Sequence, residues 1–367
     1  MIKLLELINF KSIKTHRFHL RNLNVALGLN GMGKSTFIQG LLLLRQSDNL
    51  NQGELKLNGT HVDIGKGKDA FYQYSKEDKL IFEIVFTNNV SKRFNFVYNS
   101  EADYFKTEKS EPIGSSFFNQ ALFSNSFQYL SASRTDPKTI HDKSYTSVIN
   151  HRNIGDKGQF TGHFLNVYGD NDIKFVNLKH AKSNSLQLLE QVNKWMGEIS
   201  PGVKFNVTDI PNSEYILLDM QFEQPSLGFT NKFKPANVGF GISYSLPVVT
   251  VLLAAQPGDL IIIENPESHV HPRGQAELGK LIALTAMNDV QVIIETHSDH
   301  VLNGIRVATK EKNITNDKEI LFYFEKKLEA EEQYSKITDI EVDRNGELST
   351  YPANLLDEWS NQLMKLV

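Results

Sequence analysis

Residues 28–35 read GLNGMGKS, and this stretch matches the phosphate-binding pattern G-x-x-x-x-G-K-[ST] at every fixed position. The apolar run LNVAL precedes it, and the helix-favouring segment KSTFIQGLLLLRQ follows it. In such a strand, turn and helix, backbone N–H groups and the helix N-terminus bind phosphate oxygens together. The stretch therefore predicts an α/β protein with a P-loop that binds ATP or GTP.

Each residue type in this loop has a predicted task. The glycines let backbone N–H groups turn inward, Lys34 reaches the β- and γ-phosphate oxygens, and Ser35 is a ligand for Mg²⁺. The nucleotide-binding residues predicted here are Asn30, Gly31, Met32, Gly33, Lys34, Ser35 and Thr36.

A second apolar run, LIIIE, ends at Glu264 and leads into NPESHVHP. Parallel strands direct their carboxyl ends toward the nucleotide, so Glu264 is predicted to hold Mg²⁺ through water. The next residue, Asn265, is an amide that can orient water but cannot accept its proton at neutral pH. Glu267 is the alternative catalytic base if the Asn-Pro turn bends it back, and the sequence leaves both routes open.

Two further motifs are candidates for contact with the γ-phosphate. His297 follows the apolar strand VQVIIE and a threonine, where it could hydrogen-bond the γ-phosphate or the attacking water. The turn NVGFGIS, with Gly239, Gly241 and Ser243, opens a helix and is a second anion-binding terminus. Since one chain already has its P-loop, this turn predicts two copies that meet head to tail.

Two patterns also suggest metal sites that we do not favour. Glu267, His269 and His271 have a zinc-like spacing, but the flanking prolines favour a loop over the strand that would align them. The acids of TDIEVDRNG, residues 339, 341 and 343, could mimic a nuclease cluster. A solvated edge strand that ends in the turn RNG is the better interpretation.

Composition limits the class of protein further. The chain has 367 residues, 40% hydrophobic and 22% charged, with a formal net charge of −4, so it is not coated with basic residues for nucleic acid. It contains no cysteine, which excludes disulfides, cysteine-based zinc sites and thiol catalysis. No apolar segment approaches the ~20 residues that span a bilayer, so we expect a soluble cytoplasmic protein with no membrane contact.

The chain is predicted to divide into four segments. Residues 1–134 carry the P-loop half and, from Gly53 to about Ser110, an antiparallel β-subdomain, followed by the strand Phe127–Leu130. Residues 135–235 form a mobile loop, which runs to about Asp172, and then a helical and β insertion. Residues 236–310 alternate strands and helices as in a parallel sheet, with one helix from Pro272 to about Ala286. Residues 311–367 add edge strands and a closing helix at Pro352–Leu366.

Taken in order, these motifs resemble those of the ABC-type ATPases of the SMC, RecF and OLD group. LINFKSIK resembles their opening strand, GLNGMGKST the Walker A motif, and NVGFGIS a divergent signature motif. LIIIENPESHVHP resembles Walker B with the D-loop, and ETHSDHVL the switch-histidine motif. These last three motifs and the terminal IEVDRNGELSTYPANLLDEW are most similar to a bacterial family of predicted AAA ATPases with a short C-terminal domain of unknown function, found among others in anti-phage defence.

The resemblance implies an ABC-type head with a mainly parallel core sheet, helices on both faces, an antiparallel β-subdomain and a short helical insertion. Two copies would enclose two ATP molecules, each bound by residues 28–36 of one chain and 239–243 of the other, with Gln128, or a neighbour in FQYLSASR, at the position of the Mg²⁺-sensing glutamine. No sustained heptad pattern predicts the long coiled coil of the SMC relatives. The residues after His297 are too few for the Toprim nuclease domain of OLD proteins.

The leading functional prediction is a slowly hydrolysing dimeric ATPase that regulates a nuclease or toxin effector in bacterial anti-phage defence, with DNA contact possible. One alternative is a RecF-like repair ATPase that clamps DNA, and DNA-stimulated turnover would favour it. Another is an ATP-binding scaffold that does not hydrolyse, for which nucleotide binding without phosphate release would be diagnostic.

Overall fold

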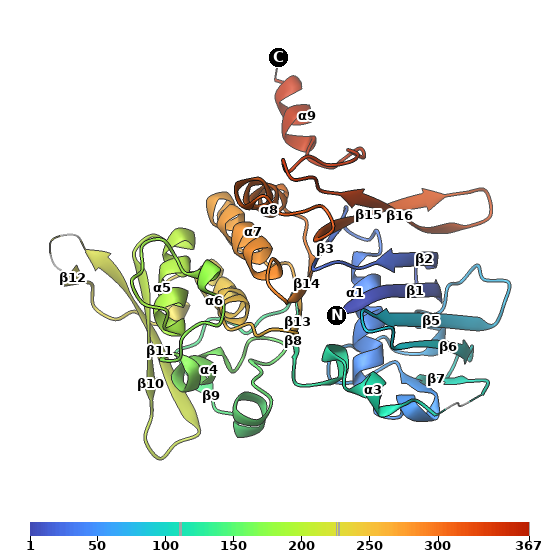
Figure 1. The fold of residues 1–367 in the computed structure, drawn as a ribbon, viewed down its shortest axis with the longest axis horizontal. Coiled ribbons are helices and arrows are strands. Elements are labelled where there is room, and N and C mark those ends of the chain that lie inside the picture. Colours follow the sequence, from blue (N-terminus) through green and yellow to red (C-terminus); the bar gives the residue numbers. More distant parts are fainter. Residues whose placement is uncertain (110–111, 225, 227, 367) are drawn as a thin grey trace. The chain divides into compact units, whose positions relative to one another are not determined.

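The computed structural model describes residues 1–109, 112–224, 226 and 228–366, and the chain folds into two compact units (Figure 1). Unit 1 contains Met1–Ser124, Glu319–Val342 and Leu348–Val367. Unit 2 contains Asn125–Lys318 and Asp343–Glu347. Both units therefore draw on segments that are far apart in the sequence.

Unit 1 contains a six-stranded antiparallel sheet with the order β2-β1-β5-β6-β7-β4. Its strands are β1 (Ile2–Phe10), β2 (Ile13–His19), β4 (Glu54–Lys56), β5 (Lys79–Phe86), β6 (Ser91–Val97) and β7 (Tyr104–Thr107). The predicted antiparallel subdomain is present, although its predicted end at Ser110 lies outside the described residues. The sheet also includes β1 and β2. The sequence did not predict β2, because its residues KTHRFH are mostly polar and only Phe18 among them is buried.

The second set of strands in unit 1 surrounds the strand that leads to the P-loop. β15 (Glu319–Leu328) pairs in parallel with β3 (Leu23–Leu27) on one side and antiparallel with β16 (Gln333–Glu341) on the other. Every residue of β3 is buried, as expected for a strand with neighbours on both faces. β15 was expected at an edge, but it is an interior strand, which explains why its first six residues are buried.

A cluster of phenylalanines joins these strands to the helix α1 (Lys34–Gln46). The rings of Phe18 and Phe37 stack with centroids 4.4 Å apart. The ring of Phe322 packs edge-on against Phe18 and is tilted against Phe37. All three side chains are fully buried. Aromatic packing of this kind fixes the helix that follows the P-loop against the strands that flank it.

Unit 2 contains three parallel strands in the order β14-β13-β8. These are β8 (Phe127–Leu130), β13 (Leu260–Glu264) and β14 (Gln291–Glu295), each apolar and almost wholly buried. The helices α6 (Phe240–Leu253) and α7 (Pro272–Ala286) pack against these strands, and α8 (Asp299–Lys312) packs on α7. The alternation of strand and helix predicted for residues 236–310 is thus present.

A second layer of unit 2 is formed by residues 135–235. It contains β9 (Ile140–Asp142), β10 (Val203–Asp209), β11 (Tyr215–Gln224), β12 (Gly228–Phe229), α4 (Thr161–Tyr168) and α5 (Leu188–Ile199). The stretch from 135 to 172, expected as a loop, includes β9, α4 and a π-helical turn at Tyr145–Asn150. Its buried residues, among them Val148, Ile154 and Phe164, are spaced too irregularly to reveal these elements in the sequence.

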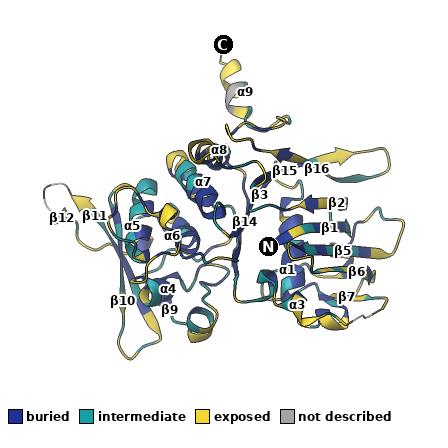
Figure 2. Cartoon of the chain, viewed as in Figure 1, coloured by how far each residue is buried: buried dark blue, intermediate teal, exposed yellow. Residues whose placement is uncertain are grey.

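The remaining helices are short. They are α2 (Gly67–Ala70), α3 (Ser115–Phe118), α9 (Glu358–Met364) and 3₁₀ turns at Leu50–Gln52, Ala121–Phe123, Val176–Leu178 and Pro235–Asn237. The C-terminal helix is shorter than the predicted Pro352–Leu366. Among the described residues no helix is long and apolar enough to span a bilayer, and none forms a long coiled coil. Figure 2 shows that burial is concentrated in the strands and in the inner faces of α1, α6 and α7.

Candidate nucleotide site

The P-loop of unit 1 has a backbone that only glycine accommodates at two of its positions. Gly28 and Gly33 have φ angles of 135° and 101°. A Cβ atom on Gly28 would lie 2.3 Å from the carbonyl oxygen of Phe324, and one on Gly33 would lie 2.3 Å from the hydroxyl of Ser335. The pattern glycines are therefore required by the conformation of the loop and by the strands packed behind it.

The loop ends at the N-terminus of α1, and Lys34 spans it. Its ammonium group donates hydrogen bonds of 2.8 Å to the carbonyl oxygens of Gly28 and Leu29, and its side chain is buried. The first turn of α1 has neither a side-chain cap nor an acidic residue, so its N-terminal dipole is available to an anion. Ser35 is exposed at this terminus and Thr36 is buried beneath it, while Asn30 and Gly31 are exposed at the tip of the loop.

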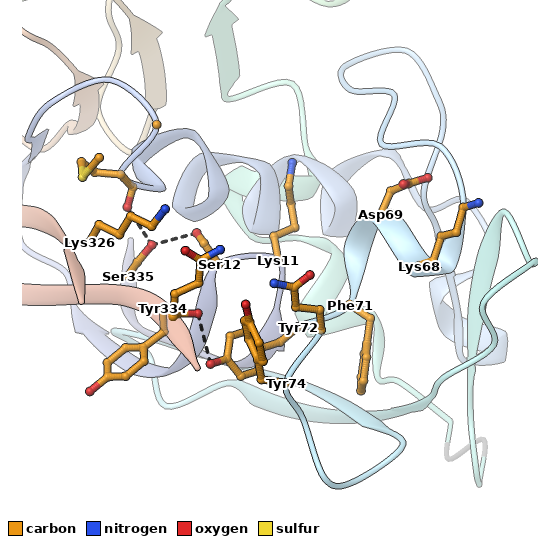
Figure 3. Close-up of a pocket in the computed structure, with 14 residues that line it drawn as sticks. Lys11, Ser12, Lys68, Asp69, Phe71, Tyr72, Tyr74, Lys326, Tyr334 and Ser335 are labelled. Atoms are coloured by element: carbon orange, nitrogen blue, oxygen red, sulfur yellow. Dashed lines mark hydrogen bonds between the residues drawn. The ribbon is translucent and has the colours of Figure 1, made fainter. Parts of the chain in front are cut away.

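A cavity of about 330 Å³ begins at Gly31 and Met32 of the loop and continues between β16 and the segment before β5. Figure 3 shows Ser12, Ser335 and Lys326 at one end and Lys68 and Asp69 at the other, with aromatic rings between them. These rings belong to Phe71, Tyr72, Tyr74 and Tyr334. A cavity of this size, with aromatic walls and a few polar groups, suits the base and ribose of a nucleotide.

The side chains at the P-loop end of the cavity are tied together. Ser335 donates a hydrogen bond of 2.7 Å to the carbonyl oxygen of Met32, and its hydroxyl lies 2.8 Å from that of Ser12. Lys11 donates to Gln39 of α1 at 2.8 Å, and burial lowers the pKa of its ammonium group although Asp69 opposes the shift. Sequence reasoning missed this cavity because its lining comes from four separate segments.

In unit 2, Glu264 ends β13 and both of its carboxylate oxygens accept hydrogen bonds. The hydroxyl of Tyr129 donates to one oxygen at 3.2 Å, and the backbone N–H of Ala132 donates to the other at 3.0 Å. Burial raises the pKa of the Glu264 carboxyl, while these hydrogen bonds and the nearby Arg134 act in the opposite direction. The carboxylate is therefore held in one orientation at the carboxyl end of the strand.

Arg134, which sequence reasoning did not single out, lies under this strand end. Its side chain is only 3% exposed, and it donates to the carbonyl oxygens of Glu264 and Asn265 at 2.6 and 3.0 Å. Burial lowers the pKa of its guanidinium to about 10, with Glu267 and Glu264 opposing the shift, so it is protonated at neutral pH. The sequence feature that could have indicated Arg134 is its position shortly after the buried strand FQYL.

Asn265 and Glu267 lie in the same turn, but their side chains have different surroundings. Asn265 has a φ of 44°, and its buried amide oxygen accepts no hydrogen bond within the described part of the chain. The Glu267 carboxylate accepts a hydrogen bond of 2.8 Å from the hydroxyl of Thr296 and one of 2.9 Å from the backbone N–H of His297. The His297 side chain itself is exposed. The structure thus brings Glu264, Asn265, Glu267 and His297 to the ends of the two neighbouring strands β13 and β14.

The glycine turn 239–243 opens α6, with Gly239 as the N-cap residue and no side-chain cap. Gly241 lies against the D-loop segment, where an added Cβ would be 2.3 Å from the carbonyl oxygen of His269. Phe240 is 51% exposed, whereas the Ser243 hydroxyl is buried and makes no hydrogen bond within the described residues. Of this turn, Gly239 and Phe240 are the residues most open to a partner.

Gln128 does not lie with these residues. In the parallel register it is opposite Ile261, whereas Leu130 is opposite Ile263, so Gln128 is at the far end of β8 from Glu264. Its side chain is buried and donates to the carbonyl oxygen of Arg152 at 2.6 Å. Of the stretch FQYLSASR, the structure therefore places Tyr129, Ala132 and Arg134 at Glu264, and Gln128 away from it.

The two metal patterns that we did not favour do not assemble. Glu267 contacts Thr296 and His297, His269 packs on the ring of Tyr244, and His271 caps α7. Of the acids of β16, Asp339 lies 3.3 Å from the His16 ring and Glu341 forms an ion pair with Arg21, while Asp343 accepts backbone N–H groups of its turn. The described residues contain no group of three or more potential metal ligands from His, Cys, Asp and Glu.

The P-loop, the buried strand that ends in Glu264 and the parallel strand order define a P-loop NTPase. The chain belongs to the family described as AAA domain, putative AbiEii toxin, Type IV TA system, which matches residues 23–303. Residues 314–366 match a second family, described as a protein of unknown function (DUF3696). No curated protein matches the chain. The predicted family resemblance is confirmed, and nucleotide binding is what this family implies.

Solved structures of SMC heads are similar to this chain. The structure of the SmcHead bound to the C-winged helix domain of ScpA shares 13% identity at a TM-score of 0.60, over 94% of this chain and 98% of that chain. The SMC head domain from Thermotoga maritima shares 11% identity at a TM-score of 0.48, over 92% and 98%. The head with an extended coiled coil derived from Pyrococcus furiosus shares 10% at 0.49, over 100% and 99%. The first of these confirms the predicted SMC-type head fold.

Proposed function

We propose that this chain is a Mg²⁺-dependent ATPase that hydrolyses ATP slowly and acts, as a head-to-tail dimer, as a regulatory subunit for a nuclease or toxin effector in bacterial anti-phage defence. The observation that carries the ATPase part is the cavity that starts at the P-loop and is walled by aromatic side chains. It provides room for a base directly beside a loop that binds phosphates.

The residues present fit a magnesium nucleotide. The Ser35 hydroxyl and the Glu264 carboxylate are oxygen donors of the kind that Mg²⁺ prefers. When bound, Mg²⁺ neutralises charge on the β- and γ-phosphate oxygens. Lys34 exchanges its bonds to Gly28 and Leu29 for phosphate oxygens, and the first turn of α1 supplies backbone N–H donors. His297, exposed beyond β14, is the proposed sensor of the γ-phosphate.

Slow turnover follows from the residues available to accept a proton from water. Asn265 is an amide and orients water without taking its proton. Glu267 is the proposed base, but its two oxygens already accept hydrogen bonds from Thr296 and His297. The two hydrogen bonds hold the carboxylate in one orientation and leave one lone-pair site open on each oxygen, while the amide at position 265 adds no second base. We therefore propose that hydrolysis is slow and acts as a timer.

The dimer is proposed from the turn at Gly239. It opens a 14-residue helix without a side-chain cap or an acidic residue in the first turn, so it is a second anion-binding terminus in a chain that already has a P-loop. In the proposed dimer, a second copy places Gly239, Gly241 and Ser243 of this turn at the γ-phosphate. The γ-phosphate is then the anion that the turn binds. Light scattering of a Glu267→Gln variant, which lacks the proposed base, should show ATP-dependent doubling of mass that Lys34→Ala lacks; an unchanged mass would contradict the dimer.

The regulatory role is supported by the names of the relatives. The matched family is named for the AbiEii toxin of Type IV TA systems, and the similar SMC head is bound to a winged-helix domain of another protein. We propose by analogy that this chain also works on a protein partner. A nuclease or toxin encoded beside it, when co-expressed, should differ in activity between the Glu264→Gln and Lys34→Ala variants.

Phosphate release from purified protein with Mg²⁺ and ATP tests the enzyme claim directly. The wild type should release phosphate above the level of Lys34→Ala, and equal levels would refute ATP hydrolysis. A fluorescent ATP analogue measured in parallel separates a non-hydrolysing scaffold, which would bind without turnover. Added DNA separates the RecF-like alternative, in which DNA would stimulate phosphate release.

A further inference from the structure

Arg134 is a buried cation, and its two hydrogen bonds both go to the main chain of one turn. One terminal nitrogen donates to the carbonyl oxygen of Glu264 at 2.6 Å and the other to that of Asn265 at 3.0 Å. The third nitrogen, Nε, is buried and has no hydrogen-bond partner among the described residues. A charge that is 3% exposed is costly to bury, so a specific task has to be sought for it.

We propose that Arg134 is a positioning residue for ATP hydrolysis, because it holds the turn that follows β13 in the shape that presents Glu264 and aims Glu267 at β14. This inference rests on the proposed ATPase function. It assigns Arg134 no contact with nucleotide or water, since its bonds are to carbonyl oxygens of the turn.

The geometry requires the fork of a guanidinium. Asn265 has a φ of 44°, in the left-handed region that asparagine tolerates and most other non-glycine residues avoid. Here the carbonyl groups of two successive residues point toward one group. The planar fork of an arginine donates to both at once, whereas lysine is a point charge that cannot reproduce the pair. Arg134 thus stabilises a turn that would otherwise relax.

The segment that ends in Arg134 also holds the carboxylate itself. Tyr129 and Ala132 donate to the two oxygens of Glu264, at 3.2 and 3.0 Å, while Arg134 donates to its carbonyl oxygen. Both ends of Glu264 are thereby fixed by residues 129–134. On the other side of the turn, Thr296 and His297 hold Glu267, so loss of Arg134 frees the turn between two anchored points.

The experiment compares Arg134→Met and Arg134→Lys with matched variants of Arg152. Arg152 is another largely buried arginine of unit 2 that donates to a carbonyl oxygen, that of Ala254, and it stacks on Phe164 and Tyr168. Each methionine variant removes the positive charge and hydrogen bonds of an arginine in unit 2, and each lysine variant keeps the charge, but only the variants at position 134 change contacts to the 264–265 turn. Thermal unfolding, nucleotide affinity, kcat and KM for ATP are measured for all four.

We expect Arg134→Met to lower kcat by about 30-fold while KM and nucleotide affinity change by less than about twofold, as when only the transition state loses support. Arg134→Lys should recover part of this loss, and both Arg152 variants should keep the kcat of the wild type. A kcat for Arg134→Met within about threefold of wild type would overturn the proposal. So would an equal loss of kcat in Arg152→Met.

Hydrogen–deuterium exchange of nucleotide-free protein gives a readout that needs no turnover. Arg134→Met should raise exchange at Ala132 and at residues 265–270, and Arg152→Met should not. Unchanged exchange there would refute the positioning role even if ATP hydrolysis were absent. If Arg134→Met does not fold, Arg134→Lys carries both measurements. Failure of the wild type to release phosphate counts against the proposed ATPase alone.

Discussion

Glu267 is hydrogen-bonded to Thr296, with 2.8 Å between its Oε2 atom and the threonine hydroxyl. This pair joins the turn after β13 to the end of β14, and Ser298 extends the connection because its N–H donates to the same hydroxyl at 3.0 Å. Ser298 also caps α8 and donates to Gln275 of α7 at 2.5 Å. The predicted base and the predicted γ-phosphate sensor at 297 are therefore parts of one hydrogen-bonded turn.

Replacing Glu267 by Gln should abolish turnover. The amide presents an NH₂ group where one of the two donors now lies and cannot accept a proton, so phosphate release should fall by about 100-fold or more. Thr296→Val is the matched control, since it removes the hydroxyl's bonds to Glu267 and Ser298 but leaves the carboxylate held by the His297 N–H. Steady-state phosphate release measures the turnover of each variant. If Glu267→Gln keeps more than about a tenth of wild-type turnover, Glu267 is not the base.

Replacing Asn265 by Glu should leave turnover no higher than in the wild type, because Glu267 already supplies the base. It should also lower stability by at least about 1 kcal/mol, since a larger, charged residue must adopt a φ of 44° with its side chain partly buried. Asn265→Gly, which accepts this φ freely, is the control for the backbone. Single-turnover kinetics and urea denaturation check both parts, and a tenfold faster N265E would place the missing carboxylate at 265.

The stability of unit 2 should depend on pH through Asp259. Burial raises the pKa of this carboxyl from 3.8 to about 6, although the N–H of Gln256 and the charge of Arg152 oppose the shift. The folded state therefore binds the proton more tightly than the unfolded state. Its contribution is fully present below pH 3.8 and is lost as pH rises through about 6, by up to about 3 kcal/mol.

Asp259→Asn removes this titration, so the difference in unfolding free energy between variant and wild type should grow from pH 4 to pH 7 in favour of the variant. Denaturant unfolding at several pH values measures it. Asp289→Asn serves as the control on the same loop region. A difference that is flat across this range would mean that the Asp259 carboxyl titrates normally in the folded protein.

Phe37→Ala should destabilise unit 1 by about 3–5 kcal/mol, the usual effect of truncating a buried phenylalanine. Phe37 is fully buried and stacks on Phe18 at 4.4 Å, so the variant leaves a void between α1 and the strands beside it. Tyr104→Ala, at a ring that is 41% exposed, should cost less than about 1 kcal/mol. Unfolding in urea tests this, and similar values for the two variants would be inconsistent with the packing described.

The sequence predicted best those elements whose role is expressed locally. The P-loop glycines, the continuous apolar strands such as Leu260–Glu264, and the helix Pro272–Ala286 with its proline at the first position all carry their signal within a few residues. The strand β2 was missed because its partners, not its own polar residues, make it a strand. α4 was missed because its buried face is too short to show a period.

The site was less predictable because its contacts cross between segments. Nothing in the spacing of Glu264, Asn265 and Glu267 reveals that a positive φ at Asn265 turns Glu267 toward Thr296. The weak candidate Gln128 was chosen by analogy, and its strand register, which the sequence does not fix, decides against contact with Glu264. The sequence did not predict a role for Arg134, because a single arginine after a strand does not match any known motif.

The strand pairing in unit 1 has an evolutionary consequence for the C-terminal segment matched as a family of unknown function. That segment, residues 314–366, supplies β15, which is hydrogen-bonded to β3, and the carbonyl oxygen of Phe324 lies against Gly28. It also supplies Ser335, which bonds to Met32. Removal of residues 314–366 would leave β3 without its neighbour β15 and Gly28 without the backbone against which it packs. We therefore expect substitutions around Phe324 and around Gly28 to be coupled, because neither side of this border packs without the other.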